Sequence, residues 1–222
     1  MGDIMGKKEI KVLKEILNVN NKIADELRKE LKNKKVLCLN LMSSPGSGKT
    51  SLLERTSSYF PKAVSVIEGD IHTTLDAERL QAVGITSFQI NTGAFGGDCH
   101  LEADWIKSAL EEIVLKKNDL LFVENIGNLV CPAEFDVGAH LNGVVLSVTE
   151  GEDKPLKYPL VFRNSQFCII SKLDLLPYLD INLQRMINNV LQINPEMEII
   201  KLSSKTREGM QDWINFLNSK RL

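Results

Sequence analysis

The chain has 222 residues, which is enough for one sizeable domain and a short appendage. Hydrophobic residues (43%) and charged residues (25%) occur at ordinary levels for a soluble globular protein, and 27 Lys and Arg nearly balance 29 Asp and Glu. This balance excludes a strongly basic nucleic-acid-binding surface, no apolar run approaches the length of a membrane span, and residues 1–8 lack the apolar core of a signal peptide. We therefore expect a cytoplasmic protein with no nucleic-acid or membrane partner, whose four cysteines are thiols.

Residues 7–35 predict an amphipathic helix, because apolar side chains recur there at helical spacing between Lys and Glu. The middle of this helix holds Asn18, Asn20 and Asn21, which are weak helix formers, so we expect a kink or a break there. We interpret residues 1–35 as a helical extension and residues 36–222 as the main domain. Docking of the helix on that domain is the favoured interpretation, and a partner-binding arm is the alternative.

From residue 36 onward, apolar strand-like runs alternate with helix-like runs. The expected strands are residues 36–42, 63–67, 86–90, 120–126, 144–149, 167–171 and 198–202. The expected helices are residues 50–59, 73–83, 100–116, 181–191 and 209–219. This order predicts an α/β fold with a doubly wound, mostly parallel sheet covered by helices on both faces. Ligands of such sheets bind at the carboxyl ends of the strands.

The run S-S-P-G-S-G-K-T at residues 43–50 lies between an expected strand and an expected helix, which is the arrangement of a P-loop. Backbone N–H groups of such a loop hold phosphate oxygens, Lys49 reaches the β- and γ-phosphates, and the Thr50 hydroxyl binds Mg²⁺. The first glycine of the motif is replaced by Ser43. The predicted phosphate-binding residues are Pro45, Gly46, Ser47, Gly48, Lys49, Thr50 and Ser51.

Two acidic positions offer Mg²⁺ further oxygen ligands. Asp70 follows the strand at residues 63–67, where a loop would respond to the γ-phosphate, and Glu124 has the place of a Walker-B carboxylate. Gly127 allows close approach of its N–H to the γ-phosphate, whereas Asp76 is interpreted as a charge at a helix N-terminus. No residue stands out as a general base, so we expect slow intrinsic hydrolysis. The predicted catalytic residues are Lys49, Asp70, Glu124 and Gly127.

The sequence S-K-L-D at residues 171–174 follows an expected strand and favours guanine over adenine. Asp174 can accept hydrogen bonds from N1–H and the 2-amino group of guanine, and adenine has neither donor. The stem of Lys172 can lie along the base, and backbone N–H groups near Ser204 and Lys205 can contact the guanine oxygen. We therefore expect GTP rather than ATP.

Cys99, His100 and Cys131 form a candidate metal site for Zn²⁺ or Ni²⁺, because thiolate and imidazole ligands suit both ions. One chain would leave a coordination position open, and two chains could share Cys131 to close the site. The alternative is two incidental thiols and a histidine at a helix N-terminus. Cys131 follows Glu124 and Gly127 closely, so nucleotide state and metal geometry would share one loop. His72 and His140 are interpreted as ordinary loop residues.

Several stretches together resemble the HypB family of GTPases, which help load nickel into nickel–iron hydrogenase. They are the P-loop, E-G-D at 68–70, C-H-L-E-A at 99–103, E-N-I-G-N-L-V-C-P at 124–132 and S-V-T-E-G-E-D-K-P-L-K-Y-P at 147–159. The resemblance covers nearly the whole chain from residue 36. It implies a SIMIBI-class P-loop GTPase that forms a GTP-controlled homodimer with a metal site at the subunit interface.

The resemblance also assigns roles to individual residues and partners. Cys99, His100 and Cys131 match the metal ligands of the family, and Lys172 and Asp174 match its guanine motif, with Ser171 in place of the usual Asn. Lys154 matches a lysine expected to reach the nucleotide of the other subunit, although a solvated surface lysine is the alternative. The implied partners are a HypA-like accessory protein and the hydrogenase large-subunit precursor. The N-terminal cysteine motif and the histidine-rich tract of some members are missing, which makes nickel storage by the N-terminus an unfavoured function.

The sequence therefore predicts a GTP-hydrolysing nickel metallochaperone. One rival is a related GTPase serving urease or another nickel enzyme, although the urease counterpart is expected to have Cys-Pro-His where this chain has Cys131-Pro132-Ala133. A second rival is a metal-binding scaffold in which GTP is structural, and a third is a small-molecule kinase, which the guanine preference disfavours.

Overall fold

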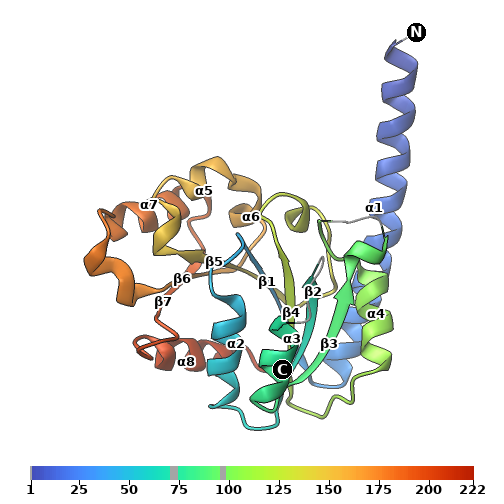
Figure 1. The fold of residues 1–222 in the computed structure, drawn as a ribbon. Coiled ribbons are helices and arrows are strands. Elements are labelled where there is room, and N and C mark those ends of the chain that lie inside the picture. Colours follow the sequence, from blue (N-terminus) through green and yellow to red (C-terminus); the bar gives the residue numbers. More distant parts are fainter. Residues whose placement is uncertain (1, 71–74, 96–98) are drawn as a thin grey trace.

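The computed structural model describes residues 2–70, 75–95 and 99–222. Within them lies a seven-stranded sheet of strand order β3-β2-β4-β1-β5-β6-β7, and every strand pairs with its neighbours in parallel (Figure 1). The strands are β1 (Leu37–Ser43), β2 (Val64–Asp70), β3 (Thr86–Asn91), β4 (Leu120–Gly127), β5 (Leu141–Ser147), β6 (Phe167–Ser171) and β7 (Glu198–Lys201). The predicted doubly wound α/β fold is confirmed.

Helices cover both faces of the sheet, because alternate residues of each buried strand point to opposite sides. The α-helices are α1 (Gly2–Asn33), α2 (Lys49–Ser57), α3 (Leu75–Ala82), α4 (Ala103–Glu111), α5 (Lys154–Lys157), α6 (Pro159–Arg163), α7 (Leu183–Ile193) and α8 (Met210–Lys220). Short 3-10 helices connect them: η1 (Thr92–Phe95), η2 (Cys131–Ala133), η3 (Val148–Glu150) and η4 (Leu173–Tyr178).

Three groups of buried apolar side chains form the core. One face of the sheet packs on α2, α3 and α8 around the fully buried Trp213, whose indole N–H donates a hydrogen bond to Thr56 Oγ1 at 2.9 Å. The opposite face packs on α1 and α4 at one end and on α6 and α7 at the other. In Figure 1, α2 lies in front of the sheet.

The expected strands and helices are all found, with bounds shifted by a few residues. Residues 73–74 of one expected helix lie outside the described residues. The expected helix at 100–116 is shorter, since α4 begins only at Ala103 and ends at Glu111. The expected strand at 144–149 begins and ends earlier, because Ser147 and Glu150 form a capping box that starts η3.

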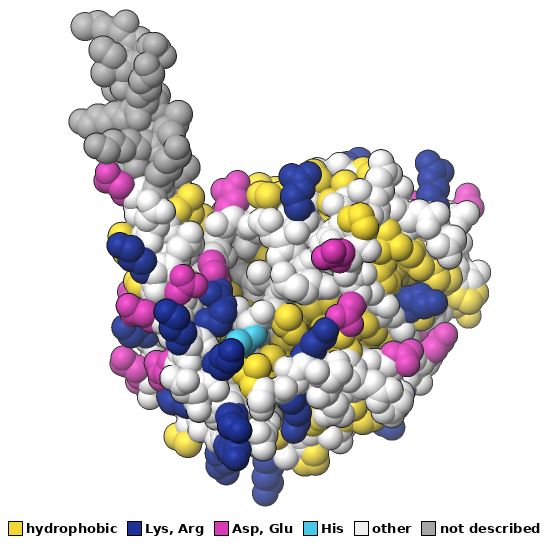
Figure 2. Space-filling view, turned by 180° about the vertical axis from the view of Figure 1, so that it is seen from behind, with side chains coloured by type: hydrophobic (Ala, Val, Ile, Leu, Met, Phe, Trp, Pro, Cys, Tyr) yellow, Lys and Arg dark blue, Asp and Glu magenta, His cyan; other side chains and the backbone are white. Residues whose placement is uncertain are grey.

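The N-terminal helix is continuous from Gly2 to Asn33, so the predicted kink or break near its asparagines is wrong. Its second half docks on the sheet through Ala24, Leu27 and Leu31, each at most 2% exposed, while its first half projects beyond the domain (Figure 1). Lys and Arg mix closely with Asp and Glu along the outer side of its described part (Figure 2). In the described part of the chain, no helix combines the length and apolarity needed to cross a membrane.

Docking of α1 is expected to contribute to global stability. Leu31→Ala should lower the free energy of unfolding by about 2–5 kcal/mol, because it removes a buried side chain from the packed interface. Urea unfolding followed by circular dichroism measures this change. Val19→Ala, at a position on the same helix that is 59% exposed, should change stability by no more than about 0.5 kcal/mol. Equal effects of the two substitutions would contradict a docked helix.

Candidate functional site

The P-loop connects β1 to α2 and has the backbone that its glycines were expected to allow. Gly46 and Gly48 have φ angles of 71° and 102°, which is the left-handed region that side chains disfavour. Lys49 is 8% exposed, and its Nζ donates a hydrogen bond to Ser43 Oγ at 2.9 Å. Ser43, which replaces the first glycine of the motif, therefore supplies a side-chain oxygen that holds Lys49 in place. Burial lowers the pKa of Lys49, and the nearby Glu124 carboxylate opposes this shift.

The predicted Mg²⁺ ligands Thr50 and Glu124 lie together. Thr50 Oγ1 donates a hydrogen bond to Glu124 Oε1 at 2.7 Å, and Glu124 Oε2 is buried without a hydrogen-bond partner among the described residues. Burial raises the pKa of Glu124, while Lys49 and the Thr50 hydrogen bond lower it. A buried carboxylate oxygen beside a hydroxyl and an ammonium group suits a divalent cation with its phosphates.

Glu68 is a site residue that sequence reasoning missed. It lies opposite Glu124 in the β2–β4 register, is 2% exposed, and has a buried Oε2 without a hydrogen-bond partner in the described ranges. Burial, followed by the charge of Glu124, raises the pKa of Glu68 to about 8. The period of two in a strand puts Glu68 and the predicted Asp70 on the same side, so this alternation was the available signal.

These side chains line a cavity of about 510 Å³ over the P-loop. Asp70, at the end of β2, and Asp76, in the first turn of α3, both border it. Gly127 borders it as well, and a Cβ at this position would lie 3.0 Å from Pro45 Cα. The end of β4 therefore packs directly against the P-loop, and a larger residue than glycine would push the two apart.

A second cavity of about 340 Å³ shares Gly48, Ser51 and Lys172 with the first. It is lined by Gly48, Ser51, Ser171, Lys172, Asp174, Leu175, Ser204 and Lys205, which include every residue predicted to contact the base. The cavity over the P-loop adjoins this second cavity, and the second cavity contains the Asp174 carboxylate. Two adjoining cavities of this kind have the shape of a nucleotide-binding site.

Contacts within this second cavity fix the orientation of the guanine motif. Asp174 Oδ1 accepts a hydrogen bond from Ser203 Oγ at 2.6 Å, and Lys172 Nζ donates to the Gly46 carbonyl at 2.6 Å. Ser171, the residue that replaces the usual Asn, donates its hydroxyl to the Ser47 carbonyl at 2.7 Å. The substitution therefore keeps a direct link between the base motif and the P-loop.

Lys154 borders neither cavity and is instead linked to the P-loop through Glu150. Its Nζ lies 3.6 Å from Glu150 Oε2, and Glu150 Oε1 accepts a hydrogen bond from Ser47 Oγ at 2.7 Å. Lys154 therefore lies outside both cavities and is connected through Glu150 to the P-loop.

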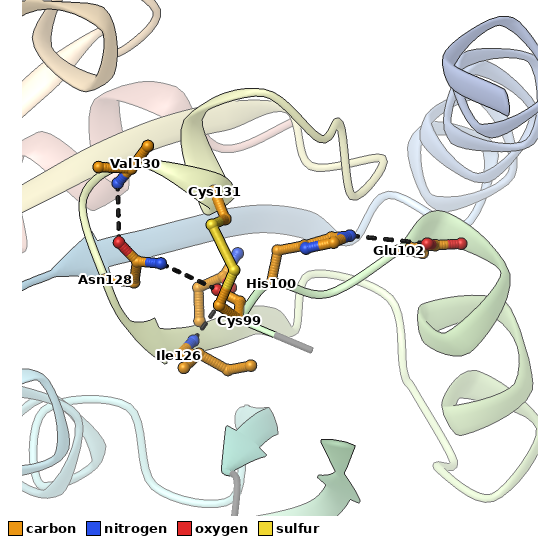
Figure 3. The surroundings of a disulfide bond; sticks show 8 residues. Cys99, His100, Glu102, Ile126, Asn128, Val130 and Cys131 are labelled. Carbon is orange, nitrogen blue, oxygen red and sulfur yellow. Dashed lines mark hydrogen bonds and ion pairs between the residues drawn. A yellow bond between two sulfur atoms is a disulfide. The ribbon is translucent and has the colours of Figure 1, made fainter. Parts of the chain in front are cut away.

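Cys99 and Cys131 are joined in a disulfide, with Cα atoms 6.0 Å apart (Figure 3). The prediction of four thiols is therefore wrong for this pair and confirmed for Cys38 and Cys168, which are free and buried. Burial raises the pKa of the Cys38 thiol to about 12 and that of the Cys168 thiol further above its usual range. The fold brings the sulfur atoms of residues 99 and 131 to one point, where they bond to each other instead of remaining separate thiols.

His100 points away from the two sulfurs toward Glu102 (Figure 3). Its Nε2 lies 3.6 Å from Glu102 Oε1, and its ring stacks on Phe135 with the centroids 3.7 Å apart. The structure therefore unites two of the three predicted metal ligands and directs the third elsewhere. Over the described ranges, no group of three or more His, Cys, Asp and Glu side chains is arranged to hold a metal.

The other two histidines were interpreted from the sequence as ordinary loop residues. His72 lies outside the described residues, and the ring Nδ1 of His140 accepts a hydrogen bond from the Cys38 N–H at 3.0 Å. Burial lowers the pKa of His140.

Asn128 links the nucleotide cavity with the cysteine pair and was also missed by sequence reasoning. Its backbone forms a bridge with Ser43, and its side-chain amide donates to the Cys99 carbonyl at 3.4 Å. Its side-chain oxygen accepts the N–H of Val130, next to Cys131. The run of residues from Glu124 to Cys131 thus contacts the P-loop at one end and both cysteines at the other.

Comparisons with known proteins agree with this geometry. Residues 37–201 match the CobW/HypB/UreG nucleotide-binding domain. The hydrogenase maturation factor HypB of Escherichia coli (strain K12) is 46% identical over 209 residues, covering 93% of this chain and 71% of that protein. The hydrogenase/urease maturation factor HypB of Helicobacter hepaticus is 43% identical over 221 residues, covering 98% and 90% respectively.

Solved structures give the same result. The crystal structure of HypB from Helicobacter pylori in complex with nickel superposes with a TM-score of 0.85 at 40% identity, covering 90% of this chain and 94% of that one. HypB from Archaeoglobus fulgidus gives a TM-score of 0.83 at 34% identity, covering 91% and 98%. The signal recognition particle 54 kDa protein from Aeropyrum pernix, at 12% identity and a TM-score of 0.53 over 87% of this chain and 51% of that one, shares the fold alone. By its sequence, its fold and its P-loop, this chain belongs to the HypB branch of the CobW/HypB/UreG family.

Proposed function

We propose that this chain is a GTP-hydrolysing metallochaperone that delivers nickel during maturation of nickel–iron hydrogenase. The observation that carries the proposal is the single segment from Glu124 to Cys131, which contacts the nucleotide cavity at one end and the cysteine pair at the other. Relatives named hydrogenase maturation factors and a relative crystallised with nickel support the same function.

GTP binds across the two cavities in this proposal. The P-loop amides and Lys49 hold the phosphates, and Asp174 accepts the two guanine donors while Lys172 lies along the base. Ser204 and Lys205 line the base cavity from the opposite side.

Hydrolysis relies on charge and position. Thr50, Asp70 and Glu124 are the residues that would hold Mg²⁺, which would supply positive charge at the phosphates when bound. Lys49 neutralises phosphate charge, and the Gly127 N–H approaches the γ-phosphate because no side chain intervenes. Slow intrinsic turnover follows if the water is positioned by a group outside this set.

Nickel is the cargo, and its capture begins with reduction of the disulfide. Two molecules of an external thiol supply two electrons and two protons and become a disulfide themselves, which leaves two protein thiols at one point, and His100 must turn from Glu102 to join them. Two subunits in a GTP-favoured homodimer would share Cys131 and place Lys154 near the partner's nucleotide. GTP shifts this equilibrium only through contacts that it makes better in one state, and the metal then passes to a HypA-like protein or the hydrogenase precursor.

Zn²⁺ suits the same ligands as Ni²⁺, so the donor set allows both. A role in urease maturation is the second candidate, because Helicobacter relatives are named hydrogenase/urease maturation factors. A cytoplasmic location stays a prediction from sequence.

The base preference depends on one carboxylate. Asp174→Asn should weaken GTP binding by about tenfold to a hundredfold and improve binding of XTP, because the amide replaces an acceptor with a donor. Competition against a fluorescent GTP analogue measures both affinities. Asp180→Asn, at a nearby exposed position outside the cavity, is the matched control and should leave both unchanged. A variant that still discriminates like the wild type would remove Asp174 from the base site.

Metal capture should require reduced cysteines. Oxidised protein is expected to bind Ni²⁺ far more weakly in equilibrium dialysis, and a phosphine reductant should restore binding, because the disulfide removes two thiolate ligands and leaves only His100. Cys131→Ser in reduced protein should weaken Ni²⁺ binding by at least about tenfold. GTP affinity of the same variant is the internal control and should stay within severalfold. Loss of GTP binding would instead identify Cys131 as a residue needed for folding.

Hydrolysis should control nickel release. Nickel-loaded, reduced protein is expected to release more metal to a chelator with GTP than with a non-hydrolysable analogue, because the γ-phosphate contacts hold the segment that carries Cys131. Stopped-flow absorbance of the nickel–chelator complex measures the two rates. Equal release in both would favour the rival function, a metal-binding scaffold with structural GTP.

A further inference from the structure

Asn20, in the middle of α1, joins the two segments that carry Cys99 and Cys131. Its side chain is buried, at 5% residue exposure, although α1 is otherwise polar on its outer side. Asn20 Oδ1 accepts a hydrogen bond from the Ala103 N–H at 2.9 Å, and Asn20 Nδ2 donates to the Asp136 carbonyl at 2.8 Å. One amide therefore satisfies two backbone groups from different parts of the chain.

The first bond fixes the segment after Cys99. Ala103 is the first residue of α4, whose early N–H groups have no partner within the helix, and the preceding Glu102 makes no side-chain capping bond. Asn20 supplies the missing acceptor from another helix. Ala103 stands only four residues after Cys99, so this bond fixes the position of the backbone shortly after Cys99.

The second bond fixes the segment after Cys131, and Arg28 reinforces it. Arg28 donates from NH2 to both carboxylate oxygens of Asp136, at 2.8 and 2.6 Å, and from Nε to the Ala139 carbonyl at 2.9 Å. Gly138 packs so closely that a Cβ there would lie 2.9 Å from Leu27 Cβ. Residues 136–139 are therefore held on α1, five residues beyond Cys131.

The two segments also meet beside the sulfurs. The His100 ring stacks on Phe135, the neighbour of Asp136, and Asn128 donates to the Cys99 carbonyl. The disulfide closes the same contact. The segments thus touch at their sulfur-bearing part, and Asn20 connects them on the side of α1.

We propose that Asn20 is a positioning residue. From its place on the N-terminal helix it sets the distance between the Cys99 and Cys131 sulfurs. Its use in nickel binding rests on the proposed function, whereas the sulfur spacing is a property of this chain alone. An asparagine at a buried helix position costs helix propensity, and the two hydrogen bonds give the physical reason for it.

The test measures the spacing through thiol–disulfide exchange in metal-free protein. Two glutathione thiols reduce the protein disulfide to two protein thiols, and one glutathione disulfide forms, so bonds and protons balance. The equilibrium constant reports how well the fold holds the two sulfurs together. Asn20→Ala should disfavour the protein disulfide severalfold, and Asn20→Asp, which keeps an acceptor for the Ala103 N–H but loses the donor to Asp136, should recover part of that loss.

Two controls separate positioning from general stability. Asp25→Ala removes the exposed partner of Arg28 on α1 and leaves the Asn20 bonds intact, so it should match the wild type. Leu31→Ala destabilises the same helix without removing either bond, and it should change the exchange equilibrium less than Asn20→Ala does. An unchanged Asn20→Ala equilibrium, or an equal effect of Leu31→Ala, would overturn the proposal.

Nickel affinity in reduced protein gives an independent outcome. If the wild type binds Ni²⁺, Asn20→Ala should bind it more weakly while its GTP affinity stays within severalfold. Equal Ni²⁺ affinity of the two proteins would overturn the positioning role. Failure of the wild type to bind Ni²⁺ would count against the proposed function, and the exchange equilibrium would still decide the role of Asn20.

Discussion

The close contact between the end of β4 and the P-loop is the constraint on which the rest of the site depends. Thr50 donates to Glu124 across this contact, and Gly127 lies so near Pro45 that a side chain would not fit. The contact is possible because β4 is the direct neighbour of β1 in a parallel sheet, so both strands present their carboxyl ends at one edge. The residues that follow Glu124, from Asn125 to Gly127, line the cavity over the P-loop.

The chain after β4 carries this constraint to the sulfur pair. Asn128 is bonded to the Ser43 backbone and to Cys99, and Cys131 follows it in η2. On the opposite side, α1 holds the continuation of the same chain through Asp136. The cysteine segments are thus held by contacts with the P-loop side and by contacts with the N-terminal helix.

The sheet, the P-loop and the base motif could be predicted from the sequence because each depends on local pattern. Strand and helix periodicity set the order of elements, and S-K-L-D lies at the predicted strand end with Asp174 in the expected cavity. The role of Asn20 could not be predicted, because its partners Ala103 and Asp136 are remote in sequence. Asn20 is a weak helix former, so the sequence predicted a helix break at this position. In the structure its side chain instead bonds to the backbone of two other segments. The alternation of Glu68 with Asp70 along the strand was a local signal for its side of the sheet, but its pairing with Glu124 depends on the strand register, which no local pattern reveals.

The disulfide and the proposed metal site use the same two sulfur atoms, so they exclude each other. A cysteine sulfur is a strong ligand for these metals only as a negatively charged thiolate, and the disulfide leaves no thiolate at Cys99 or Cys131. The fold has already brought the two sulfurs together, so a metal need not close the long loop between them. What remains for metal binding is reduction of the bond and rotation of His100 from its stack on Phe135. The spacing of the sulfurs is therefore a property of the protein scaffold, and in the proposed function the two thiolate positions are set before a metal binds.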